Sequence, residues 1–125
     1  MKQKILIVED DPDIMRILSQ TLSSAGFHVV PAYGGQDAIN KVRAQMPDLV
    51  LTDLAMPKVS GVEVIEKIKQ DPETRQIPVV AVTAYVWDGL AQAAGQKGCN
   101  GYISKPFTAK QLLQEVYKFL RPPTE

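Results

Sequence analysis

Charged and hydroxyl side chains follow four apolar runs of this chain, each at the point where the run ends. Runs of this length, rich in β-branched and aliphatic residues, are typical of buried strands. In an open parallel sheet the carboxyl ends of the strands lie along one edge, where such folds bind ligands. The sequence therefore predicts that acids, a hydroxyl and an ammonium group meet at one edge. These residues are Glu9, Asp10 and Asp11 after the first run, Asp53 after the second, Thr83 after the third and Lys105 after the fourth.

Carboxylates held close together repel one another, and one of them must stay protonated unless a cation lies between them. A hard divalent ion such as Mg²⁺ suits a site made of carboxylates, a backbone carbonyl and water. With Thr83 and Lys105 beside the ion, the site can hold a phosphoryl group, because all three stabilise charge on its oxygens. The pattern predicts a magnesium site in which Asp53 is the nucleophile and forms an aspartyl phosphate.

Each of these residues also has a purely structural interpretation. An aspartate after a strand more often caps a helix or a turn, and we expect Asp11 and Asp13 to do only that. Thr83 could simply end a strand, and Lys105 could be an exposed surface lysine. The conjunction of four strand ends, each with a part in the same chemistry, favours the phosphoacceptor hypothesis.

Length and composition exclude several other classes of protein. The 125 residues suit one domain, and the single cysteine, Cys99, excludes an internal disulfide. Neither a signal peptide nor an apolar run of about 20 residues is present, so we expect a cytoplasmic protein without a membrane span. Lys and Arg number 14 against 14 for Asp and Glu, which gives no electrostatic basis for binding nucleic acid or an anionic membrane.

Strand-like and helix-like stretches alternate along the whole chain, which predicts an α/β domain of parallel strands joined by helices. We expect five of each. The second strand is expected at 28–31, and Pro78 is expected to open the fourth. The expected helices start after the N-cap Asp11, near Gly35, at Val62, within 85–98 and after the N-cap Thr108.

Apolar residues at helical spacing predict which face of each helix points inward. The segment 85–98 is an exception, because it has three glycines and few large apolar residues, so we expect it to be the most mobile helix. The first helix is expected to bury Ile14, Ile17, Leu18, Leu22 and Ala25. The last is expected to bury Leu112, Leu113, Val116, Phe119 and Leu120.

Together these motifs resemble the receiver domain of bacterial two-component response regulators, over the span from Lys4 to Leu120. The resemblance implies a flavodoxin-like, doubly wound (βα)5 fold whose five parallel strands have the order 2-1-3-4-5. It implies a receiver domain at 1–121, followed by a tail or the start of a linker at 122–125. The motifs are Val8-Glu9-Asp10-Asp11, Asp53 with Met56-Pro57 and Gly61, Thr83-Ala84, and Tyr102-Ile103-Ser104-Lys105-Pro106-Phe107.

The resemblance also implies a role for each residue of the site. Asp53 would accept a phosphoryl group from a histidine kinase or a histidine phosphotransfer protein. The metal, Mg²⁺ or Mn²⁺, would be held by Glu9, Asp10, Asp53 and the backbone carbonyl of Ala55. Asp10 would bind it directly, and Glu9 would act mainly through metal-bound water. Ala55 and Tyr85 occupy the positions that help to set the phosphoryl lifetime. Because Ala55 cannot orient water and Tyr85 is large enough to shield the site, we expect slow self-dephosphorylation.

The remaining implied roles concern the switch. Lys105 would pair with the phosphoryl oxygens, and its bond to Pro106 would be cis. Thr83 would hydrogen-bond the phosphoryl group, vacating space into which Tyr102 turns. The fourth helix, fifth strand and fifth helix would then change their surface, which binds a downstream protein target.

The sequence thus favours a phosphorylation-controlled switch in two-component signal transduction over an enzyme that acts on a separate substrate. One rival is an aspartate-nucleophile phosphatase of the haloacid-dehalogenase type, but that class needs a second acid where this chain has Ala55. The other rival is a binding module of receiver shape that never takes phosphate. The chain could be a stand-alone regulator, which we favour slightly, or part of a longer one cut at Pro122-Pro123. His28 has no partner pattern for chemistry, and Cys99 is expected to fill a small buried space.

Overall fold

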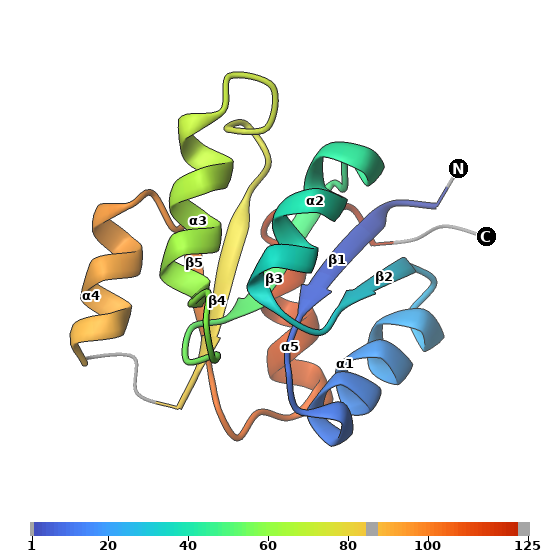
Figure 1. Ribbon diagram of the computed structural model, residues 1–125. Coiled ribbons are helices and arrows are strands. Elements are labelled where there is room, and N and C mark those ends of the chain that lie inside the picture. Colours follow the sequence, from blue (N-terminus) through green and yellow to red (C-terminus); the bar gives the residue numbers. More distant parts are fainter. Residues whose placement is uncertain (1, 85–87, 123–125) are drawn as a thin grey trace.

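A computed structural model describes residues 2–84 and 88–122 of the chain. Within these residues strands and helices alternate, as the sequence predicts (Figure 1). The strands are β1 (Lys4–Val8), β2 (His28–Ala32), β3 (Leu49–Asp53), β4 (Val79–Thr83) and β5 (Gly101–Ser104). The helices are α1 (Pro12–Ser24), α2 (Gly35–Gln45), α3 (Gly61–Gln70), α4 (Gly89–Gln96) and α5 (Ala109–Val116).

The five strands form one parallel sheet in the order β2-β1-β3-β4-β5, which confirms the predicted topology. The register pairs Val8 with Thr52, the residue before Asp53. It also pairs Thr83 with Ser104, the residue before Lys105. The carboxyl ends of β1, β3, β4 and β5 therefore lie within two residues of one another, at the lower edge of the sheet in Figure 1.

Alternate residues of each strand face opposite sides of the sheet and build two separate cores. Ile5 and Ile7 lie in the core under α1 and α5, whereas Leu6 and Val8 lie in the core under α2, α3 and α4. Figure 1 shows α2 and α3 in front of the sheet and α5 behind it. Because both faces are covered, the strands are apolar almost throughout, and polar side chains collect where the strands end.

Two of the predicted helix starts are confirmed by their capping hydrogen bonds. The side chain of Asp11 accepts hydrogen bonds from the backbone N–H groups of Asp13 and Ile14, and Pro12 is the first residue of α1. At α5 the Thr108 hydroxyl accepts from the Gln111 N–H, and the Gln111 side chain accepts from the Thr108 N–H. These two bonds form a capping box, which fixes where α5 begins.

The predicted inward face of α1 is partly wrong. Ile17 is 51% exposed, while Met15, which the sequence analysis left out, is buried with Leu18 and Leu22. Successive residues lie about 100° apart around a helix, so Ile17 and Leu18 cannot both face the sheet. The apolar spacing allowed α1 to turn either Ile17 or Met15 toward the sheet. In the structure Met15 faces the sheet and Ile17 faces solvent.

Helix α5 is shorter than its apolar pattern predicts, and helix α4 has a thin apolar face. The last helical residue of α5 is Val116, so Phe119 and Leu120 lie beyond the helix, although Leu120 is still buried. In α4 the buried residues are Ala91 and Ala94, which confirms its thin apolar face. Its mobility stays a prediction.

No helix within the described part of the chain combines the length and apolar character that crossing a bilayer requires.

Candidate functional site

The three predicted acids meet at the carboxyl edge of the sheet. Glu9 and Asp10 follow β1, and Asp53 ends β3, the strand that pairs with β1. One carboxylate oxygen of each residue lies within 4.8 Å of those of the other two. The structure therefore brings together the side chains that the sequence predicted would share one ion.

Two of these carboxylates are buried and held in place by backbone groups. Glu9 is 1% exposed and Asp53 is 9% exposed, whereas Asp10 faces solvent. The backbone N–H of Asp11 donates a 3.0 Å hydrogen bond to Oε2 of Glu9, and that of Ala55 donates a 3.3 Å bond to Oδ1 of Asp53. Asp11 therefore has two roles. Its side chain caps α1, as the sequence predicted, and its backbone N–H also orients the carboxylate of Glu9, which the sequence analysis did not predict.

Lys105 points into this cluster rather than into solvent. Its Nζ lies 2.9 Å from Oε1 of Glu9 and 3.6 Å from Oδ2 of Asp53, and its side chain is 19% exposed. Its backbone N–H donates to the carbonyl of Thr83, which ties the end of β5 to β4. The Lys105–Pro106 peptide bond is cis, as the resemblance implied.

Burial and charge shift the ionisation of the paired groups. Burial raises the pKa of Glu9, which the hydrogen bonds from Lys105 and the Asp11 N–H only partly offset, and the charge of Asp53 raises it further. Burial alone would lower the pKa of Lys105. The hydrogen bond to Glu9 and the negative charges of Asp53 and Glu9 outweigh burial, so the pKa is raised. Lys105 therefore stays cationic at neutral pH.

The residues present fit a divalent metal ion. Three carboxyl side chains meet at this edge, and the ion pairs to Glu9 and Asp53 both come from the single charge of Lys105. Hard oxygen ligands in such a cluster suit Mg²⁺, and an excess of negative charge attracts it. Glu9, Asp10 and Asp53 are the side chains that would hold the ion.

Gly61 packs closely against the end of β3, where Asp53 lies. A Cβ built on Gly61 would overlap the carbonyl oxygen of Asp53 and lie 2.7 Å from Cα of Leu54. The N–H of Gly61 donates to the carbonyl of Leu54, which holds the first turn of α3 against this segment. The sequence analysis quoted Gly61 only as part of a motif. The requirement for glycine at this position became visible only in the three-dimensional structure, which shows how closely Asp53 and Leu54 approach residue 61.

Thr83 and Tyr102, the predicted switch residues, lie on neighbouring strands. Thr83 is buried at the end of β4 beside the site. Tyr102 packs against the core under α4, and its hydroxyl donates a 2.7 Å hydrogen bond to the carbonyl of Ala91. Ala55 is exposed two residues after Asp53, while Tyr85 lies outside the described residues. The roles given to these residues stay predictions.

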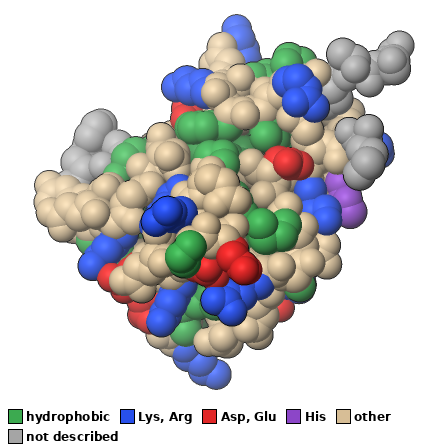
Figure 2. Space-filling view, turned by 90° about the horizontal axis from the view of Figure 1, so that it is seen from above, with side chains coloured by type: hydrophobic (Ala, Val, Ile, Leu, Met, Phe, Trp, Pro, Cys, Tyr) green, Lys and Arg blue, Asp and Glu red, His purple; other side chains and the backbone are tan. Residues whose placement is uncertain are grey.

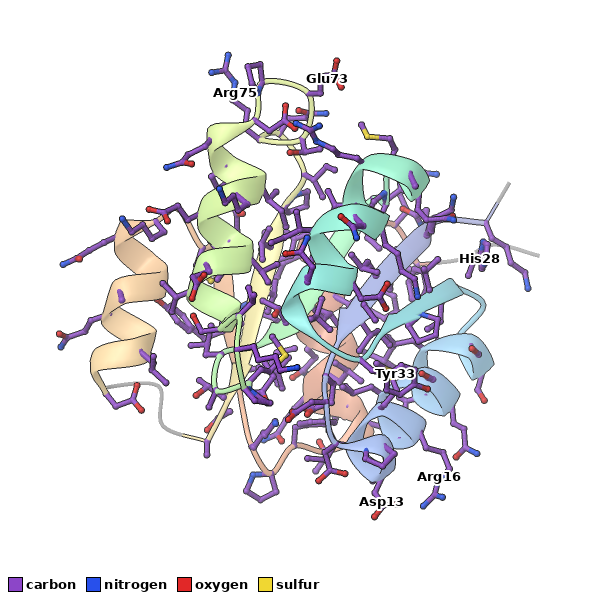
Figure 3. The ribbon with its side chains drawn as sticks, in the orientation of Figure 1. Asp13, Arg16, His28, Tyr33, Glu73 and Arg75 are labelled. Carbon is purple, nitrogen blue, oxygen red and sulfur yellow. The ribbon has the colours of Figure 1, made fainter. Side chains whose placement is uncertain are left out.

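Residues that the sequence analysis set aside lie elsewhere. His28 is exposed at the start of β2, at the opposite edge of the sheet from the acids (Figure 3). Figure 2 views that opposite edge, where acidic and basic side chains are interspersed rather than separated by sign. Cys99 is partly buried before β5, and its thiol donates to the carbonyl of Gly101. Both observations agree with structural roles.

Comparison with known proteins gives consistent matches over nearly the whole chain. The family model described as "Response regulator receiver domain" matches residues 5–117. The chain is 35% identical over 120 residues to the polar-differentiation response regulator DivK of Brucella anthropi, an alignment that covers 96% of this chain and 98% of that protein.

Solved structures agree. The chemotaxis protein CheY4 of Vibrio cholerae superposes with a TM-score of 0.91 at 27% identity, covering 96% of this chain and all of that one. The receiver domain of the sensor histidine kinase PA1611 of Pseudomonas aeruginosa superposes with a TM-score of 0.89 at 28% identity, covering 95% and 98%. That structure has a magnesium ion coordinated in its active-site cleft.

Proposed function

Because this chain belongs to the response regulator receiver domain family, we propose that it is a signalling switch controlled by Mg²⁺-dependent phosphorylation of Asp53. One observation carries the proposal. Oxygens of Glu9, Asp10 and Asp53 lie within 4.8 Å of one another, and Nζ of Lys105 lies 3.6 Å from Oδ2 of Asp53. Acids that can share a cation, beside an ammonium group that can bind phosphoryl oxygens, are the parts that phosphoryl transfer needs.

Glu9, Asp10 and Asp53, with the carbonyl of Ala55, would hold Mg²⁺ or Mn²⁺. When bound, the ion neutralises negative charge on the phosphoryl oxygens. The described carboxylates support this role in different ways. Asp10 is exposed and can exchange water for the ion, whereas buried Glu9 is fixed by Lys105 and the Asp11 N–H. The magnesium ion coordinated in the active-site cleft of the PA1611 receiver domain supports a magnesium site in a domain of this fold.

Asp53 is the nucleophile in this proposal. The N–H of Ala55 holds Oδ1, which fixes the plane of the carboxylate and leaves Oδ2 on the side of Lys105. As an oxygen of Asp53 bonds to phosphorus, the P–N bond of a phosphohistidine breaks, and the histidine nitrogen keeps the electron pair. The donor is a histidine kinase or a histidine phosphotransfer protein. Lys105 then pairs with the phosphoryl oxygens.

The output is a change of surface on α4, β5 and α5, which binds a downstream protein rather than nucleic acid or a membrane. Thr83 would move to hydrogen-bond the phosphoryl group, and Tyr102 would turn into the space that Thr83 leaves. Residues 1–121 act as the receiver domain and 122–125 as a tail or the start of a linker. We place the protein in the cytoplasm, and we assign it no activity on a separate substrate.

Acetyl phosphate with Mg²⁺ tests this function by intact mass. We expect one stable phosphoryl adduct on the wild type, none on Asp53→Asn and none when the metal is chelated. Asp37→Asn is the matched control, because Asp37 lies in α2 and pairs there with Lys41 at 3.2 Å. Turnover without an adduct would indicate a haloacid-dehalogenase-type phosphatase, and no reaction would indicate a receiver-shaped binding module. Either result would overturn the proposal.

The identities of Ala55 and Tyr85 support a long phosphoryl lifetime. Ala55 has no side-chain group that can orient an attacking water. We therefore expect Ala55→Asn combined with Tyr85→Glu to shorten the lifetime of the adduct, followed as loss of the phosphoryl mass after the donor is removed. An unchanged decay rate would contradict this assignment.

A further inference from the structure

Helix α4 is attached to the rest of the domain by few apolar contacts. Its buried residues are alanines, Ala91 and Ala94, and its one leucine, Leu90, is 38% exposed. Alanines bury little area, so polar contacts contribute a larger share of its attachment. Figure 1 shows α4 at the side of the molecule, next to α3. A single contact can therefore decide where this helix lies.

One of these polar contacts comes from the predicted switch residue itself. The hydroxyl of Tyr102 donates a 2.7 Å hydrogen bond to the carbonyl of Ala91. Gly95 lies one turn further along α4, on the same face as Ala91. A Cβ built on Gly95 would lie 2.8 Å from the Tyr102 hydroxyl oxygen, which is closer than real Cβ atoms approach. The hydroxyl therefore occupies a notch that exists because residue 95 has no side chain.

The ionisation of Tyr102 agrees with this placement. Burial raises its pKa, the nearby Cys99 raises it further, and a hydrogen bond from the backbone of Gly95 opposes both. Gly89, in the same helix, is different, because a Cβ built there would meet none of the described residues within 4 Å. Glycine destabilises a helix relative to alanine, so a glycine at 95 weakens α4 but admits the tyrosine.

We propose that Gly95 is a positioning residue of the switch, because its notch holds the Tyr102 hydroxyl on α4 in the resting protein. The inference rests on the proposed function, since it needs a phosphoryl group at Asp53 to release the contact. Tyr102 lies two residues before Ser104, the partner of Thr83, so its side chain leaves β5 on the same face of the sheet as Ser104, where it packs on the core under α4. If a ligand at Asp53 favours the released arrangement, weakening the resting contact must raise the affinity for that ligand.

Gly95→Ala in the full chain tests this, with Gly89→Ala as the matched control. Both replace glycine by alanine within α4, and alanine has the higher helix propensity, but only the methyl at 95 meets the tyrosine. Beryllofluoride with Mg²⁺ serves as the phosphoryl mimic. We expect Gly95→Ala to bind it roughly 2- to 12-fold more tightly, the range that one net hydrogen bond supplies. Gly89→Ala is expected to match the wild type.

A second readout needs no metal. The NMR signals of the Tyr102 ring in free Gly95→Ala are expected to shift toward those of the beryllofluoride-bound wild type. Tyr102→Phe, which removes only the hydroxyl, is expected to tighten beryllofluoride binding in the same direction.

Two results would overturn the inference. One is wild-type affinity in Gly95→Ala with unmoved Tyr102 signals, and the other is an equal effect of Gly89→Ala, which would assign the change to helix propensity. Failure of the wild type to bind beryllofluoride would instead overturn the proposed function. The ring signals of the metal-free protein would still test the notch in that case.

Discussion

Replacing Asp10 by asparagine is expected to stabilise the metal-free protein. The substitution removes one of three carboxylates whose oxygens lie within 4.8 Å of one another. Two unit charges at that separation repel by about 1 kcal/mol in water, which is the appropriate dielectric because Asp10 is exposed. Asp10 faces both Glu9 and Asp53, so the expected gain in the free energy of unfolding is about 1–2 kcal/mol at low salt. Screening by salt reduces it.

The same substitution is expected to remove the response to Mg²⁺. An ion that binds only the folded wild type stabilises it, by about 2.7 kcal/mol at 100 times its dissociation constant. Asp10→Asn deletes one ligand oxygen charge, so added Mg²⁺ is expected to change its stability little. Urea unfolding in the presence of a chelator, and again in the presence of Mg²⁺, measures both effects. An m-value equal to that of the wild type shows that the variant exposes the same surface on unfolding, so the free energies can be compared directly.

Asp13→Asn is the matched control. Asp13 lies in the first turn of α1 and pairs with Arg16 at 3.4 Å, with side chains that are 78% and 64% exposed. Figure 3 shows both residues on the outside of α1. We expect a change in stability within about 0.5 kcal/mol and an intact Mg²⁺ response. The reasoning is refuted if Asp10→Asn is less stable than the wild type without metal and still responds fully to Mg²⁺.

Three further predictions concern packing and ionisation. Gly61→Ala is expected to slow phosphorylation of Asp53 by about 100-fold, because an added methyl displaces the strand end, and to lower stability by about 1–3 kcal/mol. The hydrogen bond and charge of Lys97 lower the pKa of Glu66, so this stabilisation is present above the unfolded pKa and lost as pH falls through the folded one. Lys97→Met is expected to raise that pKa in an NMR titration. Burial raises the pKa of the Cys99 thiol, so iodoacetamide is expected to alkylate the native protein far more slowly than the urea-unfolded chain.

Each of these predictions has a contradicting result. For Gly61→Ala it is wild-type phosphorylation kinetics, with Gly34→Ala as the control because a Cβ at 34 meets nothing within 4 Å. For Lys97→Met it is an unmoved Glu66 titration. For Cys99 it is equal alkylation rates in the native and unfolded states.

The placement of the site followed from the sequence because parallel strands align their carboxyl ends. Apolar runs identified β1, β3, β4 and β5, and the residues that end them then had only one edge to share. Asp53 and Lys105 are 52 positions apart in the chain, yet the strand pattern alone placed them together. The capping residues Asp11 and Thr108 were equally readable, because their hydrogen bonds are local.

Features that depend on packing across the domain were not predictable in this way. The spacing of Ile17 could not show that it would be exposed, because a choice of one helix face depends on what the helix packs against. Thr74 is buried with its hydroxyl on the carbonyl of Ile68, and nothing in the local sequence indicated it. The steric demands at Gly61 and Gly95 come from residues seven or eight positions away that the turns between the elements bring into contact, and the apolar pattern does not show those contacts.

The central claim is that Asp53 itself carries the phosphoryl group. Treating the phosphorylated protein with borohydride reduces an acyl phosphate to an alcohol, which converts the modified aspartate to homoserine and marks it for peptide mass mapping. We predict homoserine at position 53 after incubation with acetyl phosphate and Mg²⁺, and none without the metal. Homoserine at Asp10, or a phosphoryl group found on His28, would contradict the account.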